Sequence, residues 1–323
     1  NSEYGLIMTT YKEINGTNIE AVSTDPANPV EGQVWYNLTD NVLKGHTLTS
    51  AGSWSTGGTL NTARWIYTHG AGTQTAGLVY GGENGPGAVT EAYNGTSWTE
   101  VNDLNTAGKA MGGGGAYTSA LTAGGTGRNS NSESWNGTSW SNTPSLNTGR
   151  EYLAAGNESS TAGVVFGGLI PPGFTNARAE TESYNGSTWT EVADLNTARR
   201  SVAGTGTSTL ALCGGGYATS NLANVETWNG SSWTEVADQN IAGGGAMFGI
   251  QSSAVKKSGG LNIELWNGTS WSTGTASSND LSNRGGLGTS SLGLLAGGES
   301  PYSTATEEYL GVGVPLTYTF TDS

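Results

Sequence analysis

The chain has 323 residues, only 12% of them charged, and a formal net charge of −14 at pH 7. Its 26 acidic residues outnumber its 12 lysines and arginines, so we expect no nucleic-acid partner, because phosphate binding draws on basic clusters. No stretch approaches the roughly 18 apolar residues of a membrane span, so we expect no membrane insertion. The 53 glycines alone would favour disorder, but 11 tryptophans and 13 tyrosines supply burial for a folded core.

The first 49 residues stand outside the pattern that fills the rest of the chain. Val34–Tyr36 and Val42–Lys44 flank a polar turn at residues 39–41, which predicts a β-hairpin. Residues 26–37 read Pro-Ala-Asn-Pro-Val-Glu-Gly-Gln-Val-Trp-Tyr-Asn. This segment resembles a module of tail-fibre and other virion proteins of bacteriophages. The resemblance implies an N-terminal anchoring segment, residues 1–49, that binds other virion proteins, although any two-stranded packing hairpin would give a similar pattern.

A repeat of roughly 40–50 residues follows. Each unit has an apolar run ending in a diglycine (Gly259-Gly260 in the fifth unit), then Glu-x-Tyr/Trp-Asn-Gly, then Ser-Trp or Thr-Trp. The tryptophans that mark the units are Trp54, Trp98, Trp140, Trp189, Trp233 and Trp271. The sixth unit is split, since Gly297-Gly298 and Glu307–Tyr309 come late in the chain and Ser53-Trp54 comes before the first complete unit. Joining its two parts predicts a ring of units with no open edge.

Each unit maps onto the strands of a propeller blade. Apolar runs such as Leu78–Tyr80 predict buried strands. Asn-Gly between Tyr93 and Trp98 predicts a type I′ hairpin turn, in which both central residues have positive φ. The link Leu-Asn-Thr-Ala-Arg, found at 60–64 and 195–199, leads into the next innermost strand. The aromatic residue and the tryptophan that flank each turn are expected to pack between neighbouring blades.

The order diglycine, aromatic residue, tryptophan is similar to the kelch repeat, and the resemblance covers residues 50–311. It implies an all-β fold, a six-bladed kelch-like β-propeller closed by a composite blade from both termini. The copper-radical oxidases share the kelch fold, but their histidine, tyrosine and cysteine ligands have no counterpart here. In residues 312–323, Leu316, Tyr318 and Phe320 alternate with threonines and predict a C-terminal strand. That strand would lie beside the sixth blade or join the N-terminal hairpin.

The loops between each diglycine and the next glutamate vary in length and content, whereas the Asn-Gly turns are nearly identical. Loops from one corner of every blade emerge on one face of a propeller, and variable loops on a rigid scaffold commonly carry binding. The longest loop, Leu169–Arg178, has an apolar tip. The candidate partner-binding residues in these loops are Arg128, Phe174, Arg178, Tyr217 and Tyr302. Drift in unconstrained loops would give the same variation.

One glutamate recurs in every unit, two residues before the aromatic position. The set comprises Glu91, Glu133, Glu182, Glu226, Glu264 and Glu307. A ring of six carboxylates would bind cations. Repetition in every blade instead favours a structural role, with backbone donors or an arginine such as Arg64, Arg150 or Arg199 as partners, because a functional site breaks the symmetry.

The sequence contains few residues that could form a metal site and no recognised catalytic motif. His46, His69 and Cys213 are the only histidines and the only cysteine, too few for a zinc, iron or copper site. Cys213 lies in an apolar run and is expected to be a small buried hydrophobe. No EF-hand calcium loop, phosphate loop or dinucleotide fingerprint is present. We therefore expect no zinc, iron or copper site, no cofactor and no enzymatic activity, and we assign no metal ligands, although calcium held by loop oxygens stays open. A glycan-cleaving enzyme with two facing carboxylates is the alternative.

The preferred functional hypothesis combines the phage-like hairpin with the loop-bearing repeats. It is a non-enzymatic phage virion structural protein, located on the particle surface, whose propeller binds a host-surface glycan or protein. The alternatives are a capsid or tail decoration protein without a receptor role, the glycan-cleaving enzyme, and a cellular kelch adaptor. A homo-oligomer is compatible with each of these readings.

Overall fold

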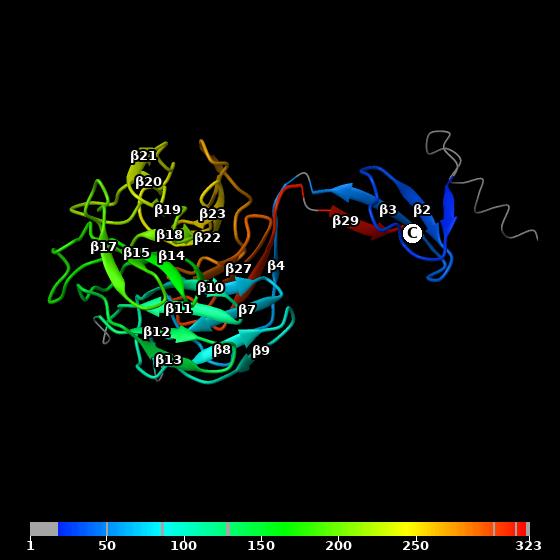
Figure 1. Cartoon of the computed structure of the whole chain (residues 1–323). Helices are drawn as coiled ribbons and strands as arrows, with labels where there is room; N and C mark the ends of the chain where they lie inside the picture. The colour runs from blue at the N-terminus through cyan, green and yellow to red at the C-terminus, as the bar shows by residue number, and fades with distance from the viewer. Residues whose placement is uncertain are drawn as a thin grey trace, which may run out of the picture. The chain divides into compact units, whose positions relative to one another are not determined.

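The computed structural model describes residues 19–49, 51–84, 87–126, 130–299, 301–313 and 315–320. These residues form strands joined by turns and loops, and no helix occurs among them, so the protein is all-β as expected (Figure 1). The chain divides into two compact units. One, here called the repeat region, is Gly52–Gly311, and the other, the small unit, combines Asn1–Ala51 with Val312–Ser323.

The small unit contains one mixed sheet with the strand order β1-β2-β3-β29. β1 (Glu20–Val22) pairs in parallel with β2 (Val34–Asn37), which pairs antiparallel with β3 (Val42–Leu48). The predicted hairpin is therefore confirmed. β29 (Pro315–Thr319) pairs antiparallel with β3. Of the two positions expected for the C-terminal strand, the structure shows the one beside the N-terminal hairpin.

A single carboxylate ties the strands of the small unit together. Asp25 accepts hydrogen bonds from Trp35 Nε1 at 2.8 Å, Asn37 Nδ2 at 2.7 Å and Lys44 Nζ at 2.8 Å. These bonds, that of Lys44 first, lower the pKa of Asp25 to about 2, because each favours the charged carboxylate. The loop before β2 is thereby fixed to both hairpin strands.

The repeat region contains six sheets among its described residues, numbered here in chain order. The first has β6 (Ala71–Thr73), β7 (Ala76–Tyr80), β8 (Thr90–Tyr93) and β9 (Trp98–Glu100). The second has β10 (Gly112–Ala116), β11 (Ser119–Ala123), β12 (Ser132–Trp135) and β13 (Trp140–Thr143). The third has β14 (Ala154–Ser159), β15 (Ala162–Phe166), β16 (Thr181–Tyr184) and β17 (Trp189–Val192).

The remaining three sheets repeat this antiparallel order. The fourth has β18 (Ala203–Gly206), β19 (Ala211–Gly214), β20 (Val225–Trp228) and β21 (Trp233–Val236). The fifth has β22 (Ala246–Ile250), β23 (Ser253–Lys257), β24 (Ile263–Trp266) and β25 (Trp271–Thr273). The sixth has β26 (Gly285–Gly288), β27 (Leu292–Ala296), β28 (Thr306–Leu310) and β4 (Ser53–Thr56), with β5 (Thr68–His69) parallel to β26.

The innermost strands of these sheets contact one another in succession. β6 contacts β10, and the series continues through β14, β18, β22 and β26, which contacts β6 again. Figure 1 labels four of these strands, β10, β14, β18 and β22. Glycines from these strands line a narrow cavity of about 100 Å³ between them. A Cβ atom on Gly113, for example, would lie 2.3 Å from Tyr80 Oη, so a larger residue there would have to displace the Tyr80 side chain. Repeated four-stranded sheets around a common centre are typical of a β-propeller.

The sixth sheet is built from both ends of the repeat region, as the split repeat predicted. β4 pairs antiparallel with β28 and places Trp54 opposite Tyr309, with ring centroids 4.8 Å apart. Tilted aromatic pairs at this distance add to the stability already gained from burial. The long sequence separation between these two residues means that the closing strand is supplied by the start of the region.

Aromatic side chains also join neighbouring sheets, as expected. Tyr80 of the first sheet meets Trp140 of the second edge-on, with centroids 4.8 Å apart, and Phe166 of the third meets Trp233 of the fourth in the same way. Trp140 Nε1 also donates to Thr90 Oγ1 of the preceding sheet at 3.0 Å. Removing one such buried ring costs about 3–5 kcal/mol in comparable cores. The packing therefore couples each sheet to the next.

The hairpin at each Asn-Gly is confirmed, but the predicted type I′ turn is wrong. Tyr93 and Trp98 are directly paired, so the loop has four residues, 94–97, and only Gly95 has positive φ. Asn94 Oδ1 instead accepts the backbone N–H groups of the third and fourth loop residues, each at 2.9 Å. Asparagine stabilises turns in this way through its own side chain. The same bonds recur at Asn136, Asn185, Asn229 and Asn267.

Candidate binding face

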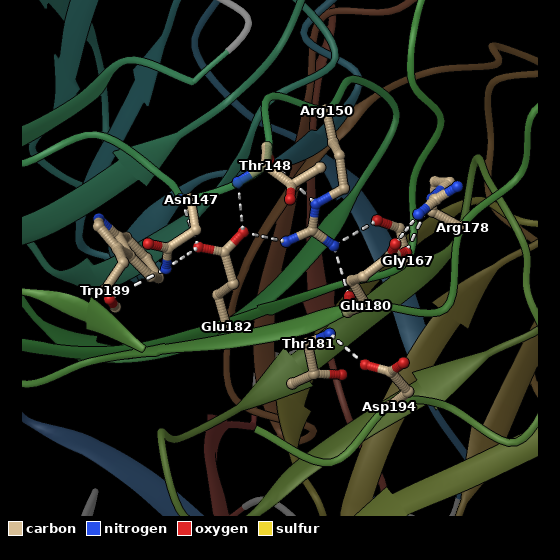
Figure 2. Close-up of polar contacts among 10 residues, drawn as sticks. All are labelled: Asn147, Thr148, Arg150, Gly167, Arg178, Glu180, Thr181, Glu182, Trp189 and Asp194. Atoms are coloured by element: carbon tan, nitrogen blue, oxygen red, sulfur yellow. Dashed lines mark hydrogen bonds and ion pairs between the residues drawn. The ribbon is translucent and has the colours of Figure 1, made fainter. Parts of the chain in front are cut away.

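The recurring glutamates are structural, as the sequence favoured. Figure 2 shows the third sheet, where Glu182 accepts from Asn147 N at 2.7 Å and Arg150 Nη2 at 2.9 Å. Arg150 also donates to the carbonyl of Gly167 at 2.9 Å. The same pairing joins Arg64 with Glu91 and Arg199 with Glu226. All six carboxylates are buried and bonded to their own link segments, which contradicts the alternative of a cation-binding ring.

The other groups considered for chemistry are buried or dispersed. Cys213 is a free, fully buried cysteine in the core between sheets, as expected, and desolvation raises the pKa of its thiol to about 12. The described residues contain no group of three or more histidine, cysteine, aspartate or glutamate side chains that could hold a metal ion. Nothing in this part of the structure therefore offers a metal centre of that kind.

Two of the predicted loop residues converge on a third side chain. Arg200, just before β18, places its guanidinium 5.2 Å from the ring centroid of Phe174 and 4.5 Å from that of Tyr217. Its Nε donates to the carbonyl oxygen of Phe174 at 2.9 Å. Arg200 and Tyr217 are also linked by two backbone hydrogen bonds of 3.0 and 2.8 Å. Phe174 is 57% exposed, so the stacked cation stands at the surface.

Further aromatic residues extend this cluster toward the first sheet. Tyr152 meets Phe174 at 5.9 Å and Tyr67 at 4.9 Å between centroids, and Tyr67 meets Trp65 at 5.5 Å. Tyr67 Oη donates to Ser201 Oγ at 2.9 Å, and burial raises the pKa of its phenol. We call the connected set the aromatic run. It comprises Trp65, Tyr67, Tyr152, Phe174, Arg200 and Tyr217.

The aromatic run combines the exposed ring of Phe174 with partly buried aromatic rings and one partly buried cation, Arg200. Tyrosine, tryptophan and arginine are the side chains most enriched where proteins bind partners, because they combine large contact area with polar groups. Lys109 lies 5.4 Å above the ring of Trp65, and Glu83 binds its ammonium at 2.7 Å. The charge of Lys109 is thus offset, whereas Arg200 contacts rings and a carbonyl.

The remaining predicted residues lie apart from the run or outside the described structure. Arg178 forms an ion pair with Glu180, its Nε donating to Oε2 at 2.9 Å. Tyr302 is 41% exposed in the loop between β27 and β28, and its ring makes none of the aromatic contacts found among the described residues. Arg128 lies outside the described residues. The structure thus brings together Phe174 and Tyr217 from the predicted set.

Sequence reasoning missed four members of the run because they belong to the links and not to the variable loops. Trp65 and Arg200 each form a backbone bridge to the residue that follows a diglycine, which places the links beside the loops on the same face. Tyr67 and Tyr152 lie one or two residues further on, and both have positive φ, near +60°. The sequence did contain a signal for these residues, because the repeats differ from one another directly after the Leu-Asn-Thr-Ala-Arg link, as they do in the variable loops.

No model of a known protein family matches this chain, and no curated protein has a significantly similar sequence. The described residues include no helix long and apolar enough to cross a membrane. What the fold and the face define is an all-β protein of the β-propeller type, with an aromatic and cationic surface on the side where its links and variable loops meet.

Proposed function

We propose that this protein is a non-enzymatic structural protein of a bacteriophage virion. In this proposal the repeat region is a six-bladed, kelch-like propeller, closed by the composite sheet, and it binds a host-surface glycan or protein. The small unit anchors the chain to other virion proteins. The phage-like hairpin supports the anchoring role, and the hairpin belongs to a compact unit separate from the repeats.

The observation that carries the binding role is the stacked arrangement of Phe174, Arg200 and Tyr217. An arginine held between two aromatic rings at a surface has no part in the repeat's structural pattern, which uses buried arginines against buried glutamates. Rings and guanidinium groups at an exposed face suit sugar rings and peptide side chains alike. A glycan-cleaving enzyme is less well supported, because the recurring carboxylates are buried in structural pairs.

The test uses the full chain. Fluorescently labelled protein is added to bacterial cells and to their purified surface polysaccharides and proteins, and retention is measured. We expect retention that falls at least about tenfold in Arg200→Ala, as for loss of a binding hot spot. Ile250→Ala serves as the control, because Ile250 is 55% exposed at the opposite end of an innermost strand.

No retention at high protein concentration, or equal loss in both variants, would contradict receptor binding through this face. Electron microscopy of particles carrying the protein separates the remaining roles. Many copies on a capsid lattice would favour a decoration protein.

A further inference from the structure

A second cavity lies beside the aromatic run, where the fifth and sixth sheets meet. Its volume is about 170 Å³. For scale, an engineered cavity of about 150 Å³ in another protein accommodates benzene. The residues that line it include Tyr67, Ser201, Gly245, Lys257, Ser282 and Arg284. Since Tyr67 belongs to both the cavity and the aromatic run, the two are continuous.

The cavity exists because the fifth repeat lacks a side chain that other repeats have. The residue before the innermost strand is Leu153 in the third sheet and Val202 in the fourth, but Gly245 in the fifth. Leu153 fills the space above Gly168, where an added Cβ would lie 3.0 Å from the leucine Cβ. Gly259 holds the register position of Gly168, but it is exposed, and a Cβ added there would meet nothing within 4 Å. Gly245, which has no side chain at the position of Leu153 and Val202, is one of the residues that line the cavity.

The fifth repeat also departs from the pattern in its second strand. Register places Lys257 opposite Ala246, the position that Phe166 holds opposite Ala154 in the third sheet. Ser258 follows, where the third sheet has the first glycine of its diglycine, so the predicted pair Gly259-Gly260 is displaced by one residue. A cation thus stands where the third repeat has an aromatic ring.

Lys257 is a buried cation without a carboxylate partner among the described residues. It is 3% exposed, and its Nζ donates to the carbonyls of Ser258 at 3.2 Å and of Gly260. The nearby Arg284 is paired with Glu307, so its charge is already offset. An ammonium group has three donors, and carbonyls only partly compensate the loss of water around a charge. Burial, and then the charge of Arg284, lower the pKa of Lys257 to about 8.

These features define the ligand that would fit. One uncompensated positive charge suits a single negative charge, and the exposed Asp280 and the Asn283-bound Glu299 oppose a second. The hydroxyl groups of Ser201 and Ser282, which line the cavity, suit a polar ring better than an apolar one. Tyrosine rings like that of Tyr67 pack against the apolar faces of such rings.

We infer that this cavity binds the carboxylate of an acidic sugar residue, with Lys257 as its counter-cation and the aromatic run holding the adjoining sugars. The inference rests on the proposed glycan-binding function and names its ligand class, a hexuronic acid.

The test measures binding of single sugars to the full chain by ligand-observed NMR. Glucuronate is expected to bind, and glucose to bind at least about tenfold more weakly, as for loss of one charge-assisted hydrogen bond. Lys257→Met should lose the preference for glucuronate. So should Ser282→Trp, which adds a bulky side chain at an exposed residue that lines the cavity and removes no charge. Lys109→Met removes the same charge from the same face, outside the cavity, and should bind glucuronate within about twofold of the unmodified chain.

Other outcomes would overturn the inference. They are equal binding of glucuronate and glucose, tighter binding of glucose 6-phosphate, or glucuronate binding that survives both cavity variants. Cell retention measured in parallel separates this inference from the proposed function. Retention of the chain on cells without glucuronate binding would overturn only the cavity's ligand, whereas glucuronate binding without retention would support the cavity and contradict the host-binding role.

Discussion

The third and fifth sheets of the repeat region share a strand order but differ in how their buried charged side chains are paired. In the third, Arg150 is fully buried against Glu182 and bonded to backbone carbonyls as well. In the fifth, Gly243 takes the place of that arginine. Lys256 Nζ lies 3.8 Å from Glu264 Oε2, and the Ser258 hydroxyl bridges the two, accepting from Lys256 and donating to Glu264. The regular repeat satisfies its charges internally, and the irregular one leaves a cation, Lys257, beside a cavity.

This difference shows how to separate structure from function in a repeat protein. In features present in nearly every sheet, such as the buried glutamate and its link, the charged and polar groups bind one another and are not available to a ligand. Features present once are available to a ligand: the Phe174–Arg200–Tyr217 stack offers contact area, and the cavity at Lys257 offers a positive charge. Both single features lie on the face where links and loops meet.

The largest expected effect comes from breaking the regular sheet. Arg150→Met should lower the free energy of unfolding by about 3–5 kcal/mol, because it leaves Glu182 buried without its cation. Urea denaturation followed by tryptophan fluorescence measures the change. The double variant Arg150→Met, Glu182→Gln should recover part of the loss. A single-variant loss below about 1 kcal/mol would show that the pair is not a structural requirement.

The fifth sheet should respond in the opposite direction and depend on pH. Lys257→Met removes a buried charge and should raise the free energy of unfolding at pH 7 by about 1–2 kcal/mol, a value reduced for solvent that reaches the cavity. In the unmodified chain, the folded pKa of Lys257 is about 8 and the unfolded value is 10.5. The unfolded chain therefore binds more protons between these values, and stability rises with pH there.

The gain from Lys257→Met should consequently shrink between pH 7 and pH 9.5, because the lysine of the unmodified folded chain has by then lost its proton. Urea titrations of both proteins at the two pH values measure this. A variant that is less stable at pH 7, or a gain that stays constant with pH, would contradict the assignment of an uncompensated buried cation.

The smallest effect should be the same in both sheets. Asn185→Ala and Asn267→Ala each remove an acceptor for two backbone N–H groups in the outer hairpin turn. Each should cost about 1 kcal/mol, with the two values agreeing within about 0.5 kcal/mol. Thermal or urea unfolding gives the comparison. Clearly unequal losses would show that the irregularity of the fifth repeat extends beyond its inner strands.

Most of the repeat region was predictable because its signals are local and recur. The apolar run, the glutamate and the Leu-Asn-Thr-Ala-Arg link each act within one unit or between neighbours, so their spacing alone predicts strands and contacts. The pairing of Trp54 with Tyr309 followed from the split repeat. The turn type failed because a side-chain acceptor, Asn94 Oδ1, replaces the backbone geometry that a type I′ turn requires.

The sequence by itself determined the strands, the structural role of the recurring glutamates and the composite sheet, since these repeat with a period that can be read along the chain. Only the tertiary structure decided which single residues meet. Tyr67 reaches Tyr152 and Ser201, and Arg200 lies between Phe174 and Tyr217, because segments far apart in sequence converge at the centre of the sheets. The cavity at Lys257 is lined by Gly245 where other sheets have Leu153 or Val202. The sequence shows that glycine, but only the arrangement of the neighbouring segments shows that a cavity lies beside it.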